Sequence, residues 1–482
     1  MITLCLKSTL RIGQLALCLT LISMAACPLI AAERPNILFI LMDDMGWRDA
    51  GCYGSTYYET PNIDRLARDG MRFTDAYVNA PVCTPSRACI ISGQSCPRHG
   101  IYIVSPDPSD AKNWDAYRSS IARRPLVPVE NNKTLSASVV GLPAALKSAG
   151  YVTGFTGKWH HRPDPTALGF DQHLRPKREK DDPKSIFGLT EQTIKFLREH
   201  RDRPFFFYLS HHAPHVPVEA REATIARFRT KSAVGGHVNP EYAAMMADAD
   251  EGIGMVLDEL DKLNLTDRTI VVLFSDNGGF LRLTSVDPLR GGKGQFYEGG
   301  IRVPLIVRWP GSVKAGSVCH EPVIGTDLYP TFLELAGASF APSHALDGQS
   351  LVALLRGQSS LDREAIFWHQ PLYTFGFDQS PCSVIRAGDY KLIEFFEDNH
   401  LELYDLNNDP GEKANLVPSM PARVRELHQR LKDWRASLHA PLPQPRVGKE
   451  AATAKPIQTP AGARARKPSH AKSKNSDRSG TP

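Results

Sequence analysis

The stretch Asn36-Ile37-Leu38-Phe39-Ile40-Leu41-Met42 is a continuous apolar run that ends abruptly at Asp43-Asp44. A strand that is covered on both faces of a parallel sheet has such a sequence, because both sets of alternating side chains are buried. In open α/β sheets the ligand crevice lies beyond the carboxyl ends of the strands. The sequence therefore predicts a central strand with two carboxylates at the edge where a ligand binds.

The same rhythm recurs along the chain. Apolar, strand-like runs at 151–155, 204–209 and 269–275 alternate with helical patterns such as 142–148 and 242–263. Polar residues follow these runs directly. This alternation predicts an α/β fold, with a large doubly wound mixed-sheet domain over residues 33–361 and its chemistry along one sheet edge.

The hydrophobic pattern of the sequence changes after about residue 361. Short alternating runs at 382–386 and 390–396 suggest antiparallel strands, and 421–438 is an amphipathic helical pattern. We expect a small C-terminal α+β subdomain with an antiparallel sheet over residues 362–440. Residues 104–135 are polar and rich in proline, which favours a surface insertion.

The two ends of the chain differ from its body. Lys7, Arg11, the apolar segment 12–26 and Ala31-Ala32 are typical of a signal peptide over residues 1–32, followed by export to the periplasm or the outside. Met24-Ala25-Ala26-Cys27 also resembles a lipoprotein processing site, so anchoring by a lipid on Cys27 is an alternative. The apolar segment is short for a transmembrane span.

Basic residues gather at the C-terminus. Residues 441–482 hold nine Lys and Arg against two Asp and Glu, and we expect this tail to be disordered. Without it the formal charge of +5 becomes −2, which gives no case for nucleic-acid binding.

The sequence does not determine how the cysteines pair. An oxidising compartment permits disulfides among the cysteines that follow the signal peptide, but sequence does not give their connectivity, and their spacing matches no zinc site. These cysteines are Cys52, Cys83, Cys89, Cys96, Cys319 and Cys382.

A second organising stretch is Cys83-Thr84-Pro85-Ser86-Arg87. Pro85 suits the first turn of a helix that continues to about Ser92, and Gly93 is a plausible stop. This pattern places Cys83 just ahead of a helix N-terminus, where an anion is favoured, with Arg87 one turn further on. For an isolated cysteine, a buried thiol in a polar turn is the usual interpretation.

Oxygen-bearing side chains follow two of the expected strands. Asp43, Asp44, Asp276 and Asn277 offer ligands that suit Ca²⁺ or Mg²⁺ rather than zinc. Sequence spacing alone does not show that they converge.

Seven ordered elements follow one another between residues 35 and 440. They are Asn36 to Asp44, Cys83-Thr84-Pro85-Ser86-Arg87, Gly157-Lys158-Trp159-His160, Ala213-Pro214-His215, Phe274-Ser275-Asp276-Asn277-Gly278, Arg290 to Gly294 with Tyr297 to Gly300, and Leu403-Tyr404-Asp405-Leu406 with Asp409-Pro410, Glu412 and Asn415-Leu416. Together they resemble the formylglycine-dependent (type I) sulfatase family, within the alkaline phosphatase superfamily.

This resemblance implies that Cys83 is oxidised to formylglycine (3-oxoalanine) by a formylglycine-generating enzyme. It implies a Ca²⁺ or Mg²⁺ ion held by Asp43, Asp44, Asp276, Asn277 and the modified residue 83. It also implies a catalytic set of Cys83, Arg87, Lys158, His160, His215 and Lys293, in which the three cationic side chains stabilise charge on the sulfuryl group, His160 is the base for sulfate elimination, and His215 with Lys293 serves the leaving oxygen. Outside these motifs, Lys158 and Lys293 would be ordinary surface lysines.

The aldehyde explains why a serine would not suffice. Its hydrate has two hydroxyl groups: one attacks sulfur, and loss of a proton from the other expels sulfate and restores the aldehyde. A sulfated serine would need water to attack it instead.

One departure from the family pattern is Gln94, where Leu-Thr-Gly-Arg is usual and this chain has Ile91-Ser92-Gly93-Gln94. We expect modification of Cys83 to proceed nevertheless. His161, Arg162, His369 and Arg386 are candidates for contacts with the rest of the substrate, with a purely structural role equally plausible.

The expected function is that of a sulfuric ester hydrolase acting on a sulfated carbohydrate or an aryl sulfate, with a formylglycine hydrate as nucleophile. Two alternatives stay open at this point. One is a phosphonate or phosphate ester hydrolase on the same fold. The other is an unmodified, non-catalytic protein that binds sulfated glycans.

Overall fold

The computed structural model describes residues 34–104, 111–339, 343–374, 376–377 and 379–447. Its main sheet has eight strands in the order β10-β2-β9-β8-β1-β7-β5-β6. The strands are β1 (Asn36–Met42), β2 (Met71–Phe73), β5 (Val152–Gly157), β6 (Gln172–Leu174), β7 (Phe205–Ser210), β8 (Thr269–Ser275), β9 (Leu305–Arg308) and β10 (Ser317–Cys319). A two-stranded parallel sheet pairs β3 (Ala76–Tyr77) with β11 (Val323–Ile324).

Strand β1 lies at the centre of the main sheet, parallel to both β7 and β8. All seven of its residues are buried, as the unbroken apolar run predicts. Ile37, Phe39 and Leu41 belong to one hydrophobic core, and the residues that alternate with them belong to the other. The prediction of a doubly wound α/β domain is confirmed, and the antiparallel β8–β9 and β2–β9 pairs make the sheet mixed.

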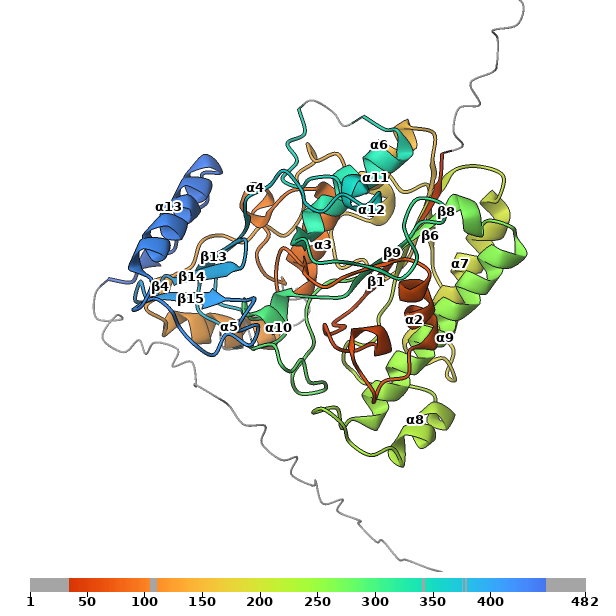
Figure 1. Ribbon diagram of the computed structural model, residues 1–482, viewed down its shortest axis with the longest axis horizontal. Coiled ribbons are helices and arrows are strands. Elements are labelled where there is room, and N and C mark those ends of the chain that lie inside the picture. Colours follow the sequence, from red (N-terminus) through yellow and green to blue (C-terminus); the bar gives the residue numbers. More distant parts are fainter. Residues whose placement is uncertain (1–33, 105–110, 340–342, 375, 378, 448–482) are drawn as a thin grey trace, which may run out of the picture.

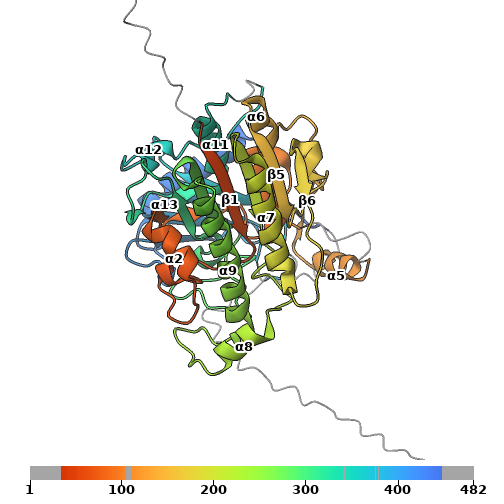
Figure 2. The same ribbon diagram turned by 90° about the vertical axis from the view of Figure 1, so that its right-hand side faces the viewer.

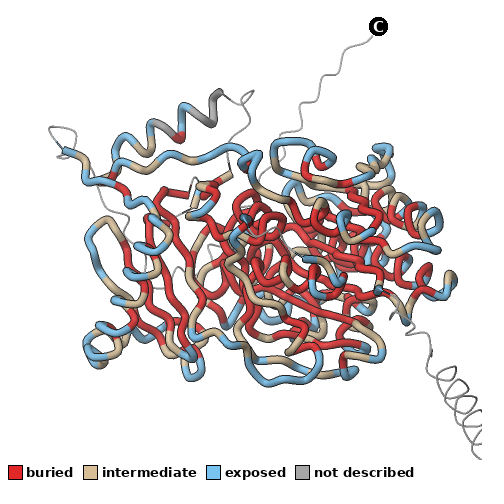
Figure 3. The backbone as a smooth tube through the Cα atoms, turned by 90° about the horizontal axis from the view of Figure 1, so that it is seen from above, coloured by how far each residue is buried: buried red, intermediate tan, exposed pale blue. Residues whose placement is uncertain are grey.

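Helices cover both faces of this sheet (Figures 1 and 2). One layer includes α2, α7 and α9, and the other includes α3, α6 and α11. The helices of the two layers and their surroundings are α2 (Pro61–Arg68), α3 (Cys83–Ser92), α4 (Cys96–His99), α5 (Ala111–Ala122), α6 (Leu142–Ser148), α7 (Ile186–His200), α8 (Glu222–Arg229), α9 (Pro240–Lys262), α10 (Glu298–Ile301), α11 (Leu328–Ala336) and α12 (Val352–Leu355). Short 3₁₀ turns span Gly51–Tyr53, Pro165–Leu168, Pro183–Ser185, Thr266–Arg268 and Gly325–Asp327. The burial pattern in Figure 3 follows from this layering, with buried backbone concentrated between the outer helices.

A second, antiparallel sheet lies beside the main one (Figure 1). Its strands are β12 (Ile366–Gln370), β13 (Cys382–Ala387), β14 (Tyr390–Phe395) and β15 (Leu401–Asp405), and α13 (Pro421–Ser437) packs on it. The predicted small C-terminal antiparallel sheet is therefore present. Lys391 of β14 is fully buried and forms ion pairs with Glu298 at 2.9 Å and Glu412 at 2.8 Å. These contacts attach the small antiparallel sheet to α10 of the large α/β domain.

One expectation about the irregular segments needs correction, namely that the chain is disordered from residue 441 onward. Residues 104–135 include helix α5 and strand β4 (Leu126–Val127). The expected disordered tail begins with β16 (Gln444–Pro445), which pairs antiparallel with β4. Backbone groups form this pairing of β16 with β4. Both segments are short and weakly apolar, so the pattern of side chains does not predict the pairing.

The expected signal peptide over residues 1–32 and residues 448–482 of the expected tail lie outside the described residues. Among the described residues, no helix combines the length and the apolar character needed to cross a membrane.

Candidate active site

The carboxyl ends of four neighbouring strands bring the predicted polar residues to one edge of the sheet. In the strand register, Met42 faces Ser275 and Gly157 faces Ser210. The residues that follow these strand ends are therefore neighbours. A side chain at Gly157 would place a Cβ only 1.7 Å from the carbonyl oxygen of Ser210, so this close approach requires glycine.

Asp43, Asp44, Asp276 and Asn277 are all buried at this edge, each at most 1% exposed. The backbone N–H of Asp44 donates to Oδ1 of Asp276 at 3.1 Å, and Nδ2 of Asn277 donates to Oδ1 of Asp44 at 2.8 Å. Asp44 adopts a φ of 70°, which is strained for a residue with a side chain. The four predicted metal-binding residues thus converge.

Cys83 opens helix α3 beside these carboxylates. It is the first helical residue rather than the residue ahead of the helix, because Val82 is extended and takes the N-cap position. The Sγ atom lies 3.5 Å from Oδ1 of Asp43 and 3.8 Å from Oδ1 of Asp44. Gly93 ends the helix with a φ of 67°, as predicted.

Arg87, one turn after Cys83, points back to the sheet edge. Its Nε donates to Oδ2 of Asp276 at 2.8 Å. Its Nη1 donates to the carbonyl oxygen of Lys158 at 2.7 Å and to Oγ of Ser210 at 2.6 Å. Sequence reasoning did not single out Ser210. Its place at the end of a buried strand, facing Gly157, was the available signal.

Two lysines complete the cationic set. Nζ of Lys158 donates to Oδ2 of Asp43 at 2.7 Å and lies 3.5 Å from Sγ of Cys83. Nζ of Lys293 donates to Oδ2 of Asp44 at 2.7 Å. Burial opposes the charge of Lys293, but the carboxylates of Asp44 and Asp43 more than offset it, so its pKa is raised and the ammonium is held charged.

Burial and neighbouring charges together lower the pKa of Asp43 and raise the pKa of Cys83. Burial alone would raise the pKa of Asp43, but Lys158 and Arg87 hold it below its usual value. Burial, reinforced by Asp276, raises the pKa of the Cys83 thiol. The unmodified thiol is therefore neutral near pH 7, and a thiolate nucleophile is disfavoured.

The histidines occupy different positions around this cluster. Nε2 of His215 lies 3.8 Å from Oδ2 of Asp44. His160 lies three residues after the end of β5, two after Lys158. It is exposed and has a φ of 61°. His211 is fully buried, and neither of its ring nitrogens has a hydrogen-bond partner among the described residues.

The donor set fits a hard divalent cation. Ligand atoms of Asp43, Asp44, Cys83 and His215 lie within 4.8 Å of one another. Oδ1 of Asn277 is buried and has no hydrogen-bond partner in the described part of the chain. Such an orphaned acceptor beside several carboxylates matches the oxygen ligands that Ca²⁺ prefers.

Other candidates lie elsewhere or serve the fold. Arg386 is buried and pairs with Asp75 at 2.8 Å, while His369 is buried between Ser383 and the carbonyl oxygen of Pro441. Gln94 lies past the far end of α3 from Cys83, where its Nε2 donates to the carbonyl oxygen of Ala345 at 3.0 Å. These three side chains therefore have partners in the fold.

Comparison with known proteins identifies the family. Residues 35–338, more than half of the chain, match the sulfatase family. The chain belongs to the sulfatase family. Residues 292–437 also match the C-terminal region of N-sulphoglucosamine sulphohydrolase. The protein is accordingly a sulfatase enzyme, and the predicted resemblance is confirmed.

Relatives along most of the chain carry sulfatase names. A sulfatase of Formosa agariphila is 32% identical, covering 85% of this chain and 90% of its own. Human N-acetylgalactosamine-6-sulfatase is 33% identical, covering 70% of this chain and 69% of its own. Human arylsulfatase A is 30% identical over 84% of this chain and 88% of its own.

Solved structures share the fold. Ps i-CgsB, in complex with k-i-k-neocarrahexaose, has a TM-score of 0.70 at 27% identity and covers 83% of this chain and 93% of its own. The phosphonate monoester hydrolase of Agrobacterium radiobacter has a TM-score of 0.65 at 20% identity and covers 86% and 100% of the two chains. At that identity the likeness concerns the fold alone.

Proposed function

We propose that this sulfatase removes sulfate from a sulfated carbohydrate, with Cys83 as the precursor of a formylglycine. The observation that carries the proposal is the position of Cys83. It opens a helix at the sheet edge, with two buried carboxylates and the Lys158 ammonium within 3.8 Å of its sulfur. A buried, neutral thiol is a poor nucleophile there, whereas an aldehyde hydrate at the same position supplies an oxygen nucleophile.

Asp43, Asp44, Asp276 and Asn277 would hold a Ca²⁺ or Mg²⁺ ion together with the modified residue 83. When bound, such an ion supplies positive charge that favours a deprotonated oxygen and offsets charge on the sulfate. The fit rests on the buried oxygens and on the orphaned Oδ1 of Asn277.

The protein's own cations surround the place where a sulfuryl group must sit. Arg87, Lys158 and Lys293 are each held by a carboxylate of this cluster, so their positive charges are fixed before substrate arrives. Preorganised charge of this kind stabilises developing negative charge on sulfuryl oxygens. We assign that role to these three side chains.

Two histidines are assigned the proton transfers. His215, close to Asp44, would serve the leaving oxygen together with Lys293. His160, at the exposed end of the Lys158 segment, would take the proton whose loss expels sulfate. Imidazole suits both tasks because one ring nitrogen can accept a proton while the other can donate one.

The names of relatives support the choice of a sulfated saccharide as the substrate. Two of them are named for galactosamine sulfate and aryl sulfate hydrolysis, and the 27% identical Ps i-CgsB binds a neocarrahexaose. We therefore place sulfated saccharides first and aryl sulfates as simple test substrates.

We also propose how the protein is exported, modified and divided into domains. Residues 1–32 would direct export to the periplasm or the outside, and a formylglycine-generating enzyme would modify Cys83. Residues 33–361 would form the catalytic domain, 362–440 the subdomain beside it, and the remaining basic residues a tail.

Rates on a matched aryl sulfate and aryl phosphate test the reaction class. We expect the sulfate ester to be hydrolysed with much the higher kcat/KM. A preference for the phosphate or a phosphonate ester would favour the alternative hydrolase. Absence of any hydrolysis, together with an unmodified Cys83 thiol in protein co-produced with the modifying enzyme, would leave the glycan-binding alternative.

A further inference from the structure

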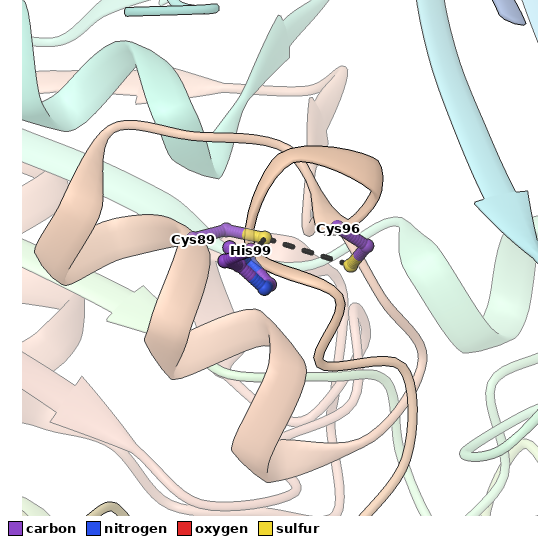
Figure 4. Close-up of side chains that lie close together, drawn as sticks. All are labelled: Cys89, Cys96 and His99. Carbon is purple, nitrogen blue, oxygen red and sulfur yellow. Dashed lines mark hydrogen bonds between the residues drawn. The ribbon is translucent and has the colours of Figure 1, made fainter. Parts of the chain in front are cut away.

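Two other cysteines of the same helical segment lie side by side (Figure 4). Cys89 is in the last turn of α3, and Cys96 is the first residue of the one-turn helix α4. Their Sγ atoms are 3.6 Å apart, and the two residues are 0% and 3% exposed. Neither belongs to the cluster around Cys83.

The turn between the two cysteines is fixed by its own contacts. The N–H of Gly93 donates to the carbonyl oxygen of Cys89 at 2.8 Å, and Gly93 adopts a φ of 67°. The backbone N–H and the hydroxyl of Ser95 donate to Oδ2 of Asp347 at 2.8 Å and 2.7 Å. The chain is thereby turned back so that the two sulfurs face each other.

His99 discriminates between a metal site and a thiol pair. Its Nδ1 accepts the backbone N–H of Ile101 at 3.1 Å, so the proton of the neutral ring is on Nε2. That Nε2 lies 3.3 Å from Sγ of Cys89. Burial lowers the pKa of His99 to about 3, which keeps the ring neutral.

A protonated Nε2 donates to the sulfur and has no lone pair to offer a metal ion. Metal binding through Nε2 would require the ring proton to move to Nδ1, and the buried N–H of Ile101 would then lose its acceptor. The hydrogen-bond pattern therefore favours a thiol pair over a Cys-Cys-His metal site.

We infer that Cys89 and Cys96 are joined by a disulfide when the chain folds under oxidising conditions. The sulfurs would have to approach from 3.6 Å to a bond length of about 2.05 Å, which side-chain rotation on a fixed turn can provide. The inference does not depend on the sulfatase mechanism.

The bond would form by exchange with a small-molecule or protein disulfide. The thiolate of one cysteine attacks that disulfide and releases one thiolate, which takes up a proton. The second cysteine, as its thiolate, attacks the resulting mixed disulfide and releases the other. The two cysteines together lose two electrons and two protons, and the oxidant becomes two thiols. Since burial raises the pKa of the Cys89 thiol, this exchange takes place before the segment is buried.

Such a disulfide would close a short loop at the far end of the helix that carries Cys83 and Arg87. Gln94 lies inside this loop, at the position where the family pattern has arginine. The covalent link would fix the C-terminal end of α3 independently of the charges at its N-terminal end.

Trypsin offers a direct test, because the tryptic peptide 88–98 contains Cys89 and Cys96 and no further cysteine. Full-length protein produced with export and without reductant is denatured, alkylated and digested. We expect this peptide to be unalkylated and lighter by two hydrogen atoms than the dithiol, and to take up two alkyl groups after reduction. The Cys382 peptide is the internal control, because Cys382 is buried and should be alkylated without reduction.

Variants separate this pairing from general protection of buried thiols. In Cys96→Ala, Cys89 should become open to alkylation without reduction, whereas Cys382→Ala should leave the 88–98 peptide oxidised. Alkylation of both Cys89 and Cys96 in the exported wild type without reduction would overturn the inference, and so would one zinc ion per chain held by these thiols.

Discussion

Arg87 and Asp276 form an ion pair across the sheet edge, with Nε and Oδ2 2.8 Å apart and the two side chains 1% and 0% exposed. The pair connects the helix that begins with Cys83 to the end of β8. A charge buried this completely is costly unless it is paired, so each partner holds the other in place. It also fixes a guanidinium beside Cys83 before any substrate is bound.

Replacement of Arg87 by lysine tests this arrangement. Arg87→Lys keeps the charge but removes the fork that reaches Asp276, Ser210 and the Lys158 carbonyl oxygen. We expect kcat/KM for an aryl sulfate to fall by about 10²–10³-fold. Arg229→Lys, in an exposed ion pair with Glu222, is the matched control and should stay near wild type. Activity of Arg87→Lys within a few-fold of wild type would argue against the assigned role.

Removal of divalent cations should abolish sulfate release and lower the unfolding temperature, because buried carboxylates would then lack part of their compensating charge. Added Ca²⁺ should restore both. Asn277→Ala should raise the Ca²⁺ concentration needed for half-maximal activity by roughly 10–100-fold. Asn36→Ala, at the opposite end of β1, should affect stability without this shift. An unchanged Ca²⁺ requirement in Asn277→Ala would remove Asn277 from the ligand set.

The buried Lys391 should be critical for stability rather than for chemistry. Lys391→Met leaves the buried Glu412 without its ion pair and leaves Glu298 with Arg302 alone, so we expect the free energy of unfolding to fall by about 3–5 kcal/mol. Lys432→Met on the exposed side of α13 is the control. Chemical denaturation measures both, and equal stability of the two variants would contradict the account of how the small sheet is anchored.

Stability should fall on mild acidification. Burial lowers the pKa of His369 to about 4, below the value near 6.5 of an unfolded histidine. The unfolded chain therefore binds the proton first, so the stabilisation is complete above pH 6.5 and is lost as pH falls towards 4. At pH 5 this one group should cost about 2 kcal/mol relative to neutral pH.

Urea unfolding at pH 7.5 and pH 5 measures this loss. His369→Gln should flatten the dependence, whereas the exposed His320→Gln should leave it unchanged. The buried His99, whose pKa is lowered to about 3, acts in the same direction. A wild type with equal stability at both pH values would refute the assignment.

Much of this arrangement could be predicted from sequence because short motifs coincide with strand ends. The apolar runs before Asp43 and Asp276 predict buried parallel strands, and parallel strands align their carboxyl ends. Ser210 and the pairing of β16 with β4 could not be predicted. A serine at a strand end resembles many others, and backbone pairing between two weakly patterned segments leaves little trace in side-chain periodicity. The facing of Cys89 and Cys96 depends on a turn at Gly93 whose direction sequence does not specify.

In the proposed mechanism, sulfate release depends on conversion of Cys83 to an aldehyde. We would prepare the protein with varying amounts of a formylglycine-generating enzyme and measure, in each batch, the converted fraction of the tryptic peptide 73–87 and the rate of sulfate release. We expect the rate to be proportional to the converted fraction, and we expect Cys83→Ser, folded with a wild-type unfolding transition, to show no turnover. Full activity in a batch whose Cys83 is entirely a free thiol would contradict this mechanism.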